Sequence, residues 1–235
     1  MTPSVPVTPP RSSLSTIAKF LSTSIGRKVL MAATGLLLLA FLVFHLAGNL
    51  LIYSGAASFN EHSHELISNP LVYLAELGLI VLFVAHLVSG ILVYRRGASA
   101  RPQAYRLKRW AGHTSQKSWA STTMILSGLV VLVFVPVHLW TFKFGAYYTS
   151  ADHPEMRDLH RLVIEEFQKP GYVIWYVFAM AVIGFHLCHG FGSAFESLGI
   201  GNRTALRRVG HLLAVLLTVG FLSIPIAVYL FGDKL

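Results

Sequence analysis

Five long apolar runs divide this 235-residue chain, and each of them is long enough to cross a lipid bilayer. About 20 apolar residues at a rise of ~1.5 Å per residue span a hydrocarbon core of ~30 Å. The first run cannot be an ordinary soluble helix, because no Asp, Glu, Lys or Arg occurs between Lys28 and Glu61. The pattern predicts an all-α integral membrane bundle of five transmembrane helices, over residues 27–52, 71–94, 119–140, 172–195 and 209–231.

The segment before the first run differs in character. Residues 1–13 contain four prolines and no apolar core, which indicates a cytoplasmic tail without a packed structure. Apolar residues then recur at helical spacing beside Lys19, which predicts a short interfacial helix. We therefore expect residues 1–26 to form a tail with an interfacial helix, and residues 27–235 to form the transmembrane domain.

Composition and charge agree with a membrane protein and predict its orientation. With 54% hydrophobic and 12% charged residues, the chain lies outside the soluble range of about 25% charged. Fourteen of the 19 Lys and Arg residues lie on the side that holds the N-terminus, which predicts a cytoplasmic N-terminus and an external C-terminus. Because topology explains where these charges lie, the net charge of +9 is no sign of nucleic-acid binding. The single cysteine, Cys188, excludes a disulfide framework and a Cys-x-x-Cys-His haem attachment.

Four of the five runs contain a histidine, and the predicted topology assigns each one a depth. His45 and His138 lie 17 and 21 residues beyond the nearest preceding lysine, roughly 25–30 Å from the cytoplasmic ends, in the outer half. His86 and His186 lie 9 and 10 residues before the next charged residue, about 13–15 Å from the cytoplasmic side, in the inner half. Ionisable side chains in hydrocarbon are costly and indicate function. Two pairs at two depths are what two stacked cofactors with trans-axial imidazole ligands require.

The first and third runs share a motif of a hydroxyl residue, a glycine and then, after nine residues, a histidine. A hydroxyl eleven residues before the histidine returns to within roughly 20° of the same helix face. We therefore expect Thr34 and Ser127 to face the bundle interior at the level of the inner pair. The adjacent Gly35 and Gly128 would leave room for a flat macrocycle.

The second and fourth runs also resemble each other. Gly90 and Gly190 each follow a histidine at i+4, on nearly the same face of their helices. The pattern predicts a helix-pair repeat, in which helices 1 and 2 are repeated as helices 3 and 4.

Haem fits the two histidine pairs better than a proton relay, a zinc site or structural histidines do. A proton relay would more often include Asp or Glu at mid-membrane, and zinc would need a tetrahedral cluster at one depth. Purely structural histidines would not be expected in two matched layers. Haem iron held by two neutral imidazoles accounts for both pairs. His189, one turn from His186, competes with it as a ligand, and Gly190 favours His186.

The remaining histidines are expected to lie outside the membrane core. His113 and His211 stand beside cytoplasmic basic residues, which predicts an interfacial position. His153 and His160 occur in the long outer loop, where we expect them to be solvated.

At this point the residues resemble a known family, the five-helix dihaem cytochrome b membrane anchors of succinate:quinone oxidoreductases and quinol:fumarate reductases. The resemblance covers nearly the whole chain from Ser24 onward. It is carried by the stretch 32–45 beginning Ala-Ala-Thr-Gly, by the loop from Phe59-Asn60 to Asn69-Pro70, and by His86, His138 and residues 186–193.

The resemblance implies two non-covalent b-type haems, with His86 and His186 ligating the inner one and His45 and His138 the outer one. It implies a multi-pass subunit of respiratory complex II in the bacterial cytoplasmic (inner) membrane. A flavoprotein with FAD and an iron–sulfur subunit would bind on the cytoplasmic side and carry out the dicarboxylate chemistry. The basic loops 95–117 and 203–208 would receive the iron–sulfur subunit and compensate haem propionates, a role that Thr34, Ser127 or Ser121 would share.

The expected activity is that of a succinate dehydrogenase subunit that passes electrons through the haems to menaquinone, as part of the tricarboxylic acid cycle. Relatives tie an outer-loop glutamate to the quinone, and Glu65 is the candidate here, with Glu61 and Glu76 nearby. Some fumarate reductases carry a glutamate where this chain has Gly184, so transmembrane proton coupling is not expected.

Other functions stay open at this stage. A quinol:fumarate reductase would run the same architecture in reverse, and a hydrogenase or formate dehydrogenase cytochrome b would use another partner. A transporter or helical scaffold with structural histidines is the non-enzymatic alternative. The sequence leaves the direction of turnover, the quinone, the oligomeric state and the role of loop 144–171 undecided.

Overall fold

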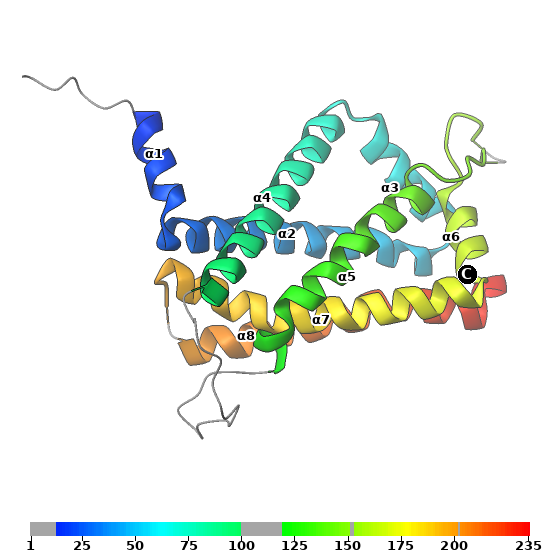
Figure 1. Ribbon diagram of the computed structural model, residues 1–235. Helices are drawn as coiled ribbons and strands as arrows, with labels where there is room; N and C mark the ends of the chain where they lie inside the picture. Colours follow the sequence, from blue (N-terminus) through cyan, green and yellow to red (C-terminus); the bar gives the residue numbers. More distant parts are fainter. Residues whose placement is uncertain (1–12, 100–118, 151–152, 202) are drawn as a thin grey trace, which may run out of the picture.

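The computed structural model describes residues 13–99, 119–150, 153–201 and 203–235, and this part of the chain is all-helical, as predicted (Figure 1). Five of its helices are long and apolar enough to cross a membrane. Their bounds are α2 Ser24–Asn49, α4 Leu71–Ser99, α5 Trp119–Phe142, α7 Pro170–Leu198 and α8 Arg203–Phe231. The predicted fold class and the five predicted runs are thereby confirmed.

Shorter helices lie at the two ends of the bundle. Helix α1, Ser13–Ser22, corresponds to the predicted short helix before the first span. At the other end lie the 3-10 helices η1, Leu50–Ser54, and η2, Gly232–Lys234, together with helices α3, Ala56–Ser68, and α6, Leu159–Phe167. The sequence pattern did not predict α3 or α6. Residues 1–12 of the predicted tail and 100–117 of the predicted basic loop lie outside the described residues.

Local side-chain and backbone chemistry sets where the helices begin and end. The Thr23 hydroxyl caps α2 by accepting a hydrogen bond from the Gly26 N–H at 2.9 Å, and the Asp158 carboxylate caps α6. Helix α7 ends at Gly199, whose positive φ of 69° is a conformation that glycine adopts without strain. Helices α5 and α8 continue through Pro136 and Pro225.

The long helices form two groups. Helices α2, α7 and α8 run side by side, while α4 crosses α2 obliquely and α5 crosses α7 obliquely (Figure 1). Helices α4 and α5 touch each other only sparsely, and an ion pair between Glu76, near the start of α4, and Lys143, just after α5, joins them. The N-terminal ends of α2 and α8 and the C-terminal ends of α4 and α7 gather at one end of the molecule (Figure 1).

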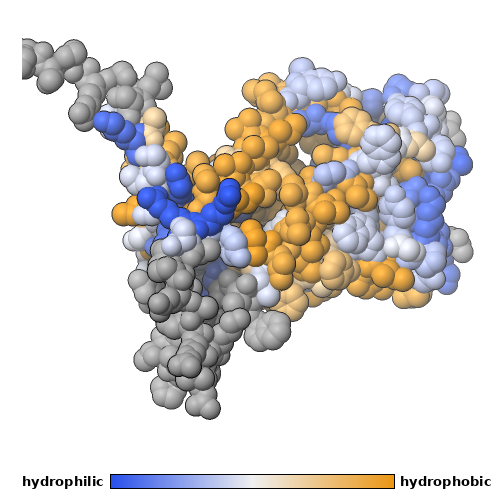
Figure 2. All heavy atoms as spheres, viewed as in Figure 1, coloured by the Kyte–Doolittle hydropathy of each residue, from blue (hydrophilic) through white to orange (hydrophobic). Residues whose placement is uncertain are grey.

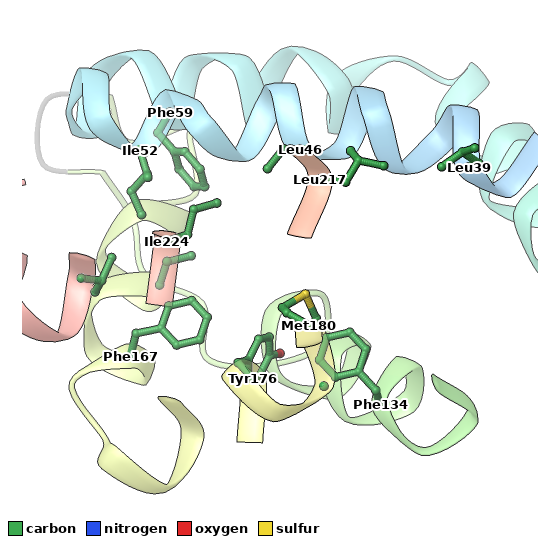
Figure 3. Packing of buried hydrophobic residues seen from close by; sticks show 13 residues of the cluster. Leu39, Leu46, Ile52, Phe59, Phe134, Phe167, Tyr176, Met180, Leu217 and Ile224 are labelled. Atoms are coloured by element: carbon green, nitrogen blue, oxygen red, sulfur yellow. The ribbon is translucent and has the colours of Figure 1, made fainter. Parts of the chain in front are cut away.

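Apolar side chains from seven elements form the core. Figure 3 shows Leu39, Leu46 and Ile52 from α2 and η1 facing Leu217 and Ile224 from α8, with Tyr176 and Met180 of α7 below. The backbone of α8 packs directly against the Leu46 side chain of α2 at Gly220, where a Cβ would lie 2.6 Å from Leu46 Cδ2. This core holds α2, α7 and α8 together. Helix α4 packs against α2, and α5 packs against α7.

The outer surface of the bundle is apolar. Figure 2 shows a broad hydrophobic band with hydrophilic residues gathered at the two ends of the molecule. Helix α4 is the most exposed of the candidate spans, with only 6% of its most apolar window buried. Such a surface is unfavourable in water and suits contact with lipid. The chain is therefore a multi-pass membrane protein.

Candidate functional site

The structure brings the four histidines of the spans together as two pairs. The rings of His86, on α4, and His186, on α7, have centroids 6.3 Å apart and planes at 68°. The rings of His45, on α2, and His138, on α5, have centroids 5.7 Å apart and planes at 89°. Each pair therefore joins one helix of the first half of the chain to one helix of the second half.

The Nδ1 atoms of the inner pair contact oxygen atoms. His86 Nδ1 lies 3.0 Å from the Met31 carbonyl oxygen and 3.3 Å from Thr34 Oγ1. His186 Nδ1 lies 2.9 Å from Ser127 Oγ. A carbonyl oxygen only accepts hydrogen bonds, so His86 carries its proton on Nδ1 and leaves Nε2 with a free lone pair.

The glycines beside the two hydroxyl residues also face the inner rings. A Cβ at Gly35 would lie 2.9 Å from His86 Cε1, and a Cβ at Gly128 would lie 4.0 Å from His186 Cε1. The space above Gly35 is therefore filled by the His86 ring. Gly90 lies near Met31, where a Cβ would stand 3.9 Å from its sulfur, whereas a Cβ at Gly190 would meet no atom within 4 Å among the described residues.

The outer pair has different partners. His138 Nδ1 lies 3.2 Å from the Tyr176 hydroxyl, which belongs to α7. His45 Nδ1 lies 3.4 Å from Asn49 Nδ2, an amide that also donates to the His45 carbonyl oxygen at 2.7 Å. Phe41 stacks on the His45 ring at 5.2 Å, and Phe134 stacks on the His138 ring at 5.5 Å. Aromatic side chains thus hold both outer imidazoles.

The separation of the rings in each pair is close to that of two ligands on one metal ion. Two imidazoles that bind one ion from opposite sides at a metal–nitrogen distance of ~2.0–2.1 Å have their ring centroids roughly 6.4 Å apart. The inner separation of 6.3 Å matches this value, and the outer separation of 5.7 Å is shorter. In the part of the chain that the structure describes, no three or more His, Cys, Asp or Glu side chains gather as a metal-binding group. The two ring pairs fit centres with two protein ligands each, as haem iron has.

The other histidines in the spans and loops take varied positions. His186, and not His189, provides the ring that pairs with His86. His211 is exposed, His113 lies outside the described residues, and His153 is exposed beside Glu155. The prediction that His160 is solvated is wrong.

His160 lies at the start of α6, and its side chain is only 8% exposed. Its ring packs edge-on against Phe59, and its backbone N–H donates to Asn60 Oδ1 at 2.9 Å. Burial lowers the pKa of His160, and the nearby Asp158 carboxylate opposes this shift less strongly. Its Nε2 is buried and has no hydrogen-bond partner in the described part of the chain.

The acidic residues considered for the quinone site lie at the surface or in an ion pair. Glu65 is exposed on α3, at the outer end of the bundle, and Glu61 is exposed on the same helix. Glu76 pairs with Lys143. Gly184 packs directly against Thr218 of α8, so a larger residue there would displace the Thr218 side chain.

Sequence reasoning missed several partners of the histidines. Asn49 follows His45 at i+4, so its place on the same helix face was available from the sequence. Met31 and Tyr176 gave no such signal, because their contacts with His86 and His138 join different helices.

One curated protein resembles this chain along most of its length. The chain is similar to the succinate dehydrogenase cytochrome b558 subunit of Bacillus subtilis (strain 168). The two are 24% identical over 181 residues, which make up 76% of this chain and 82% of the relative. No family model and no solved structure matches the chain.

Proposed function

We propose that this chain is the membrane-anchor cytochrome b subunit of a succinate dehydrogenase, carrying electrons from an iron–sulfur subunit through two b-type haems to menaquinone. The observation that carries the proposal is the pair of cross-helix imidazole contacts, with ring separations of 6.3 Å and 5.7 Å. The printed name of the Bacillus subtilis relative supports the same class of complex.

Four imidazoles would hold the two haems. His86 and His186 would ligate the inner iron, and His45 and His138 the outer one. A bound b-type haem supplies reversible one-electron transfer. The chain's own contribution is to orient the imidazoles and, at the inner pair, to keep the ligating nitrogens unprotonated. Gly35, Gly90, Gly128 and Gly190 would line the haem environment, in a helix-pair repeat where Thr34–His86 and Ser127–His186 are equivalent contacts.

The remaining assignments follow from the same proposal. The N-terminus would be cytoplasmic in a bacterial inner membrane, because most basic residues lie at that end. The flavoprotein, with FAD, and the iron–sulfur subunit would dock there, against the basic segments 95–117 and 203–208. Glu65, at the outer end, would be the residue nearest the quinone chemistry.

Purification of the tagged chain from its native membrane tests this proposal. We expect a flavoprotein and an iron–sulfur protein to co-purify, and a reduced-minus-oxidised spectrum with b-type bands. Recovery of a metal-centre dehydrogenase would favour the hydrogenase or formate dehydrogenase alternative instead. A colourless preparation would contradict the proposal and favour a transporter or scaffold.

A further inference from the structure

The hydroxyl groups of Thr34 and Ser127 have only one way to satisfy all their contacts. Each hydroxyl has one proton to donate and two lone pairs that accept. Thr34 Oγ1 donates to the Leu30 carbonyl oxygen at 2.7 Å, and Ser127 Oγ donates to the Met124 carbonyl oxygen at 3.0 Å. The proton of each hydroxyl therefore points back into its own helix.

Since the hydroxyl protons are committed, the ring contacts must run in the opposite direction. His86 Nδ1, 3.3 Å from Thr34 Oγ1, and His186 Nδ1, 2.9 Å from Ser127 Oγ, are hydrogen bonds only if Nδ1 carries the proton. The Met31 carbonyl oxygen, 3.0 Å from His86 Nδ1, makes the same demand independently. Both inner rings then keep a free lone pair on Nε2.

We propose that Thr34 and Ser127 are positioning residues that select the tautomer of His86 and His186, so that Nε2 of each ring is the metal-binding nitrogen. This inference rests on the proposed function. In this role each hydroxyl accepts a hydrogen bond from Nδ1–H of its histidine ring. Such an acceptor raises the basicity of the other ring nitrogen, the one that would bind the metal. This role differs from the binding of haem propionates, which would leave the ring tautomers unset.

Other buried hydroxyls lack this arrangement and serve as controls. Ser89 donates to carbonyl oxygens of its own helix α4, and Thr218 donates to the Ala214 carbonyl oxygen of α8. Among the hydrogen bonds of the described residues, neither contacts a histidine ring. Both are buried or partly buried in spans, so they match Ser127 and Thr34 in size and environment.

The test replaces each hydroxyl in the complete complex and measures haem retention and the reduction potential of each haem. Ser127→Ala and Thr34→Val should weaken haem binding at the inner site by about tenfold or more, the range seen when groups behind metal ligands are lost. The inner haem's reduction potential should rise, because a less basic imidazole stabilises ferric iron less. Ser127→Ala should act more strongly, because His86 retains the Met31 carbonyl oxygen when Thr34 is replaced.

Rescue and control variants separate this effect from simple unfolding. Ser127→Thr and Thr34→Ser keep the hydroxyl and should behave as the unaltered protein, as should Ser89→Ala and Thr218→Val. The outer haem should be unchanged throughout. The inference is overturned if Ser127→Ala leaves the inner haem unaffected, or if it affects both haems equally. A wild-type complex without haem would instead overturn the proposed function, so the two failures are distinguishable.

Discussion

The two histidine pairs differ in whether their hydrogen bonds determine which ring nitrogen carries the proton. Behind the inner rings stand oxygen acceptors, contributed by Met31, Thr34 and Ser127. Behind the outer rings stand the amide nitrogen of Asn49, which only donates, and the phenol of Tyr176, which can donate or accept. The protein's contacts therefore place the proton on Nδ1 of both inner rings, whereas His45 Nδ1 faces a donor and the contact of His138 leaves its tautomer unset.

Gly35 and Gly128 occupy equivalent sequence positions but differ in the space around them. A Cβ at Gly35 would lie 2.9 Å from His86 Cε1, and this ring is pinned by two acceptors. Gly35→Ala should therefore displace His86, reduce haem at the inner site and destabilise the protein by about 1–3 kcal/mol, as overpacking does. Haem spectra and thermal unfolding of the purified complex would measure both effects.

Gly78→Ala, on α4, is the control for this substitution. A Cβ at Gly78 would meet no atom within 4 Å among the described residues, and Gly78 has no part in the proposed haem sites, so the change should be close to neutral. An inner haem that survives Gly35→Ala but not Gly78→Ala would contradict the packing described here.

His160 predicts a dependence of stability on pH. Burial lowers its pKa in the folded protein below the unfolded value of about 6.5. The unfolded chain therefore takes up this proton first as the pH falls, and stability declines from about pH 6.5 towards the folded pKa. Thermal unfolding between about pH 8 and pH 5 should show this decline, and His160→Leu should reduce it. The exposed His153, changed to Ala, should leave the decline as it is in the unaltered protein.

At the scale of elements, one side chain fastens α3 to α6. Asn60 is 4% exposed, its Nδ2 donates to Asp158 Oδ1 at 2.8 Å, and its Oδ1 accepts from the His160 N–H at 2.9 Å. Asn60 thus binds the capping residue of α6 and the first turn of that helix together. The two short helices form one cap over the outer end of the bundle.

Asn60→Ala should loosen this cap. The substitution leaves the buried His160 N–H without its acceptor, which costs about 1–3 kcal/mol. We expect lower thermal stability and faster hydrogen exchange in α6. Ser63→Ala removes only a bond within α3, to the Phe59 carbonyl oxygen, and should have little effect. Equal effects of the two substitutions would show that Asn60 does not join the helices.

The long helices could be predicted from the sequence, but the short outer helices could not. Uninterrupted apolar runs identify a span by length alone, because a bilayer sets the required length. Helices α3 and α6 are short and mixed in composition, and contacts such as those of Asn60 join residues 98 and 100 positions apart. The burial of His160 depends on these contacts, which is why its environment was predicted wrongly.

At the scale of the whole molecule, the histidine pairs could be anticipated because topology converts sequence position into depth. Antiparallel spans place His86 and His186 at one level and His45 and His138 at another, and the structure brings these rings together. Depth alone does not say which helices are neighbours. That α4 packs on α2 and α5 on α7 emerges only from the structure.

The most direct test of the account is the haem content per chain in the purified complex, measured for the unaltered protein and for four single His→Ala variants. The account predicts two b-type haems per chain, and one in each variant. His45→Ala and His138→Ala should lose one spectral component, and His86→Ala and His186→Ala should lose the other. A single haem in the unaltered chain, or loss of the same component from His45→Ala and His86→Ala, would contradict it.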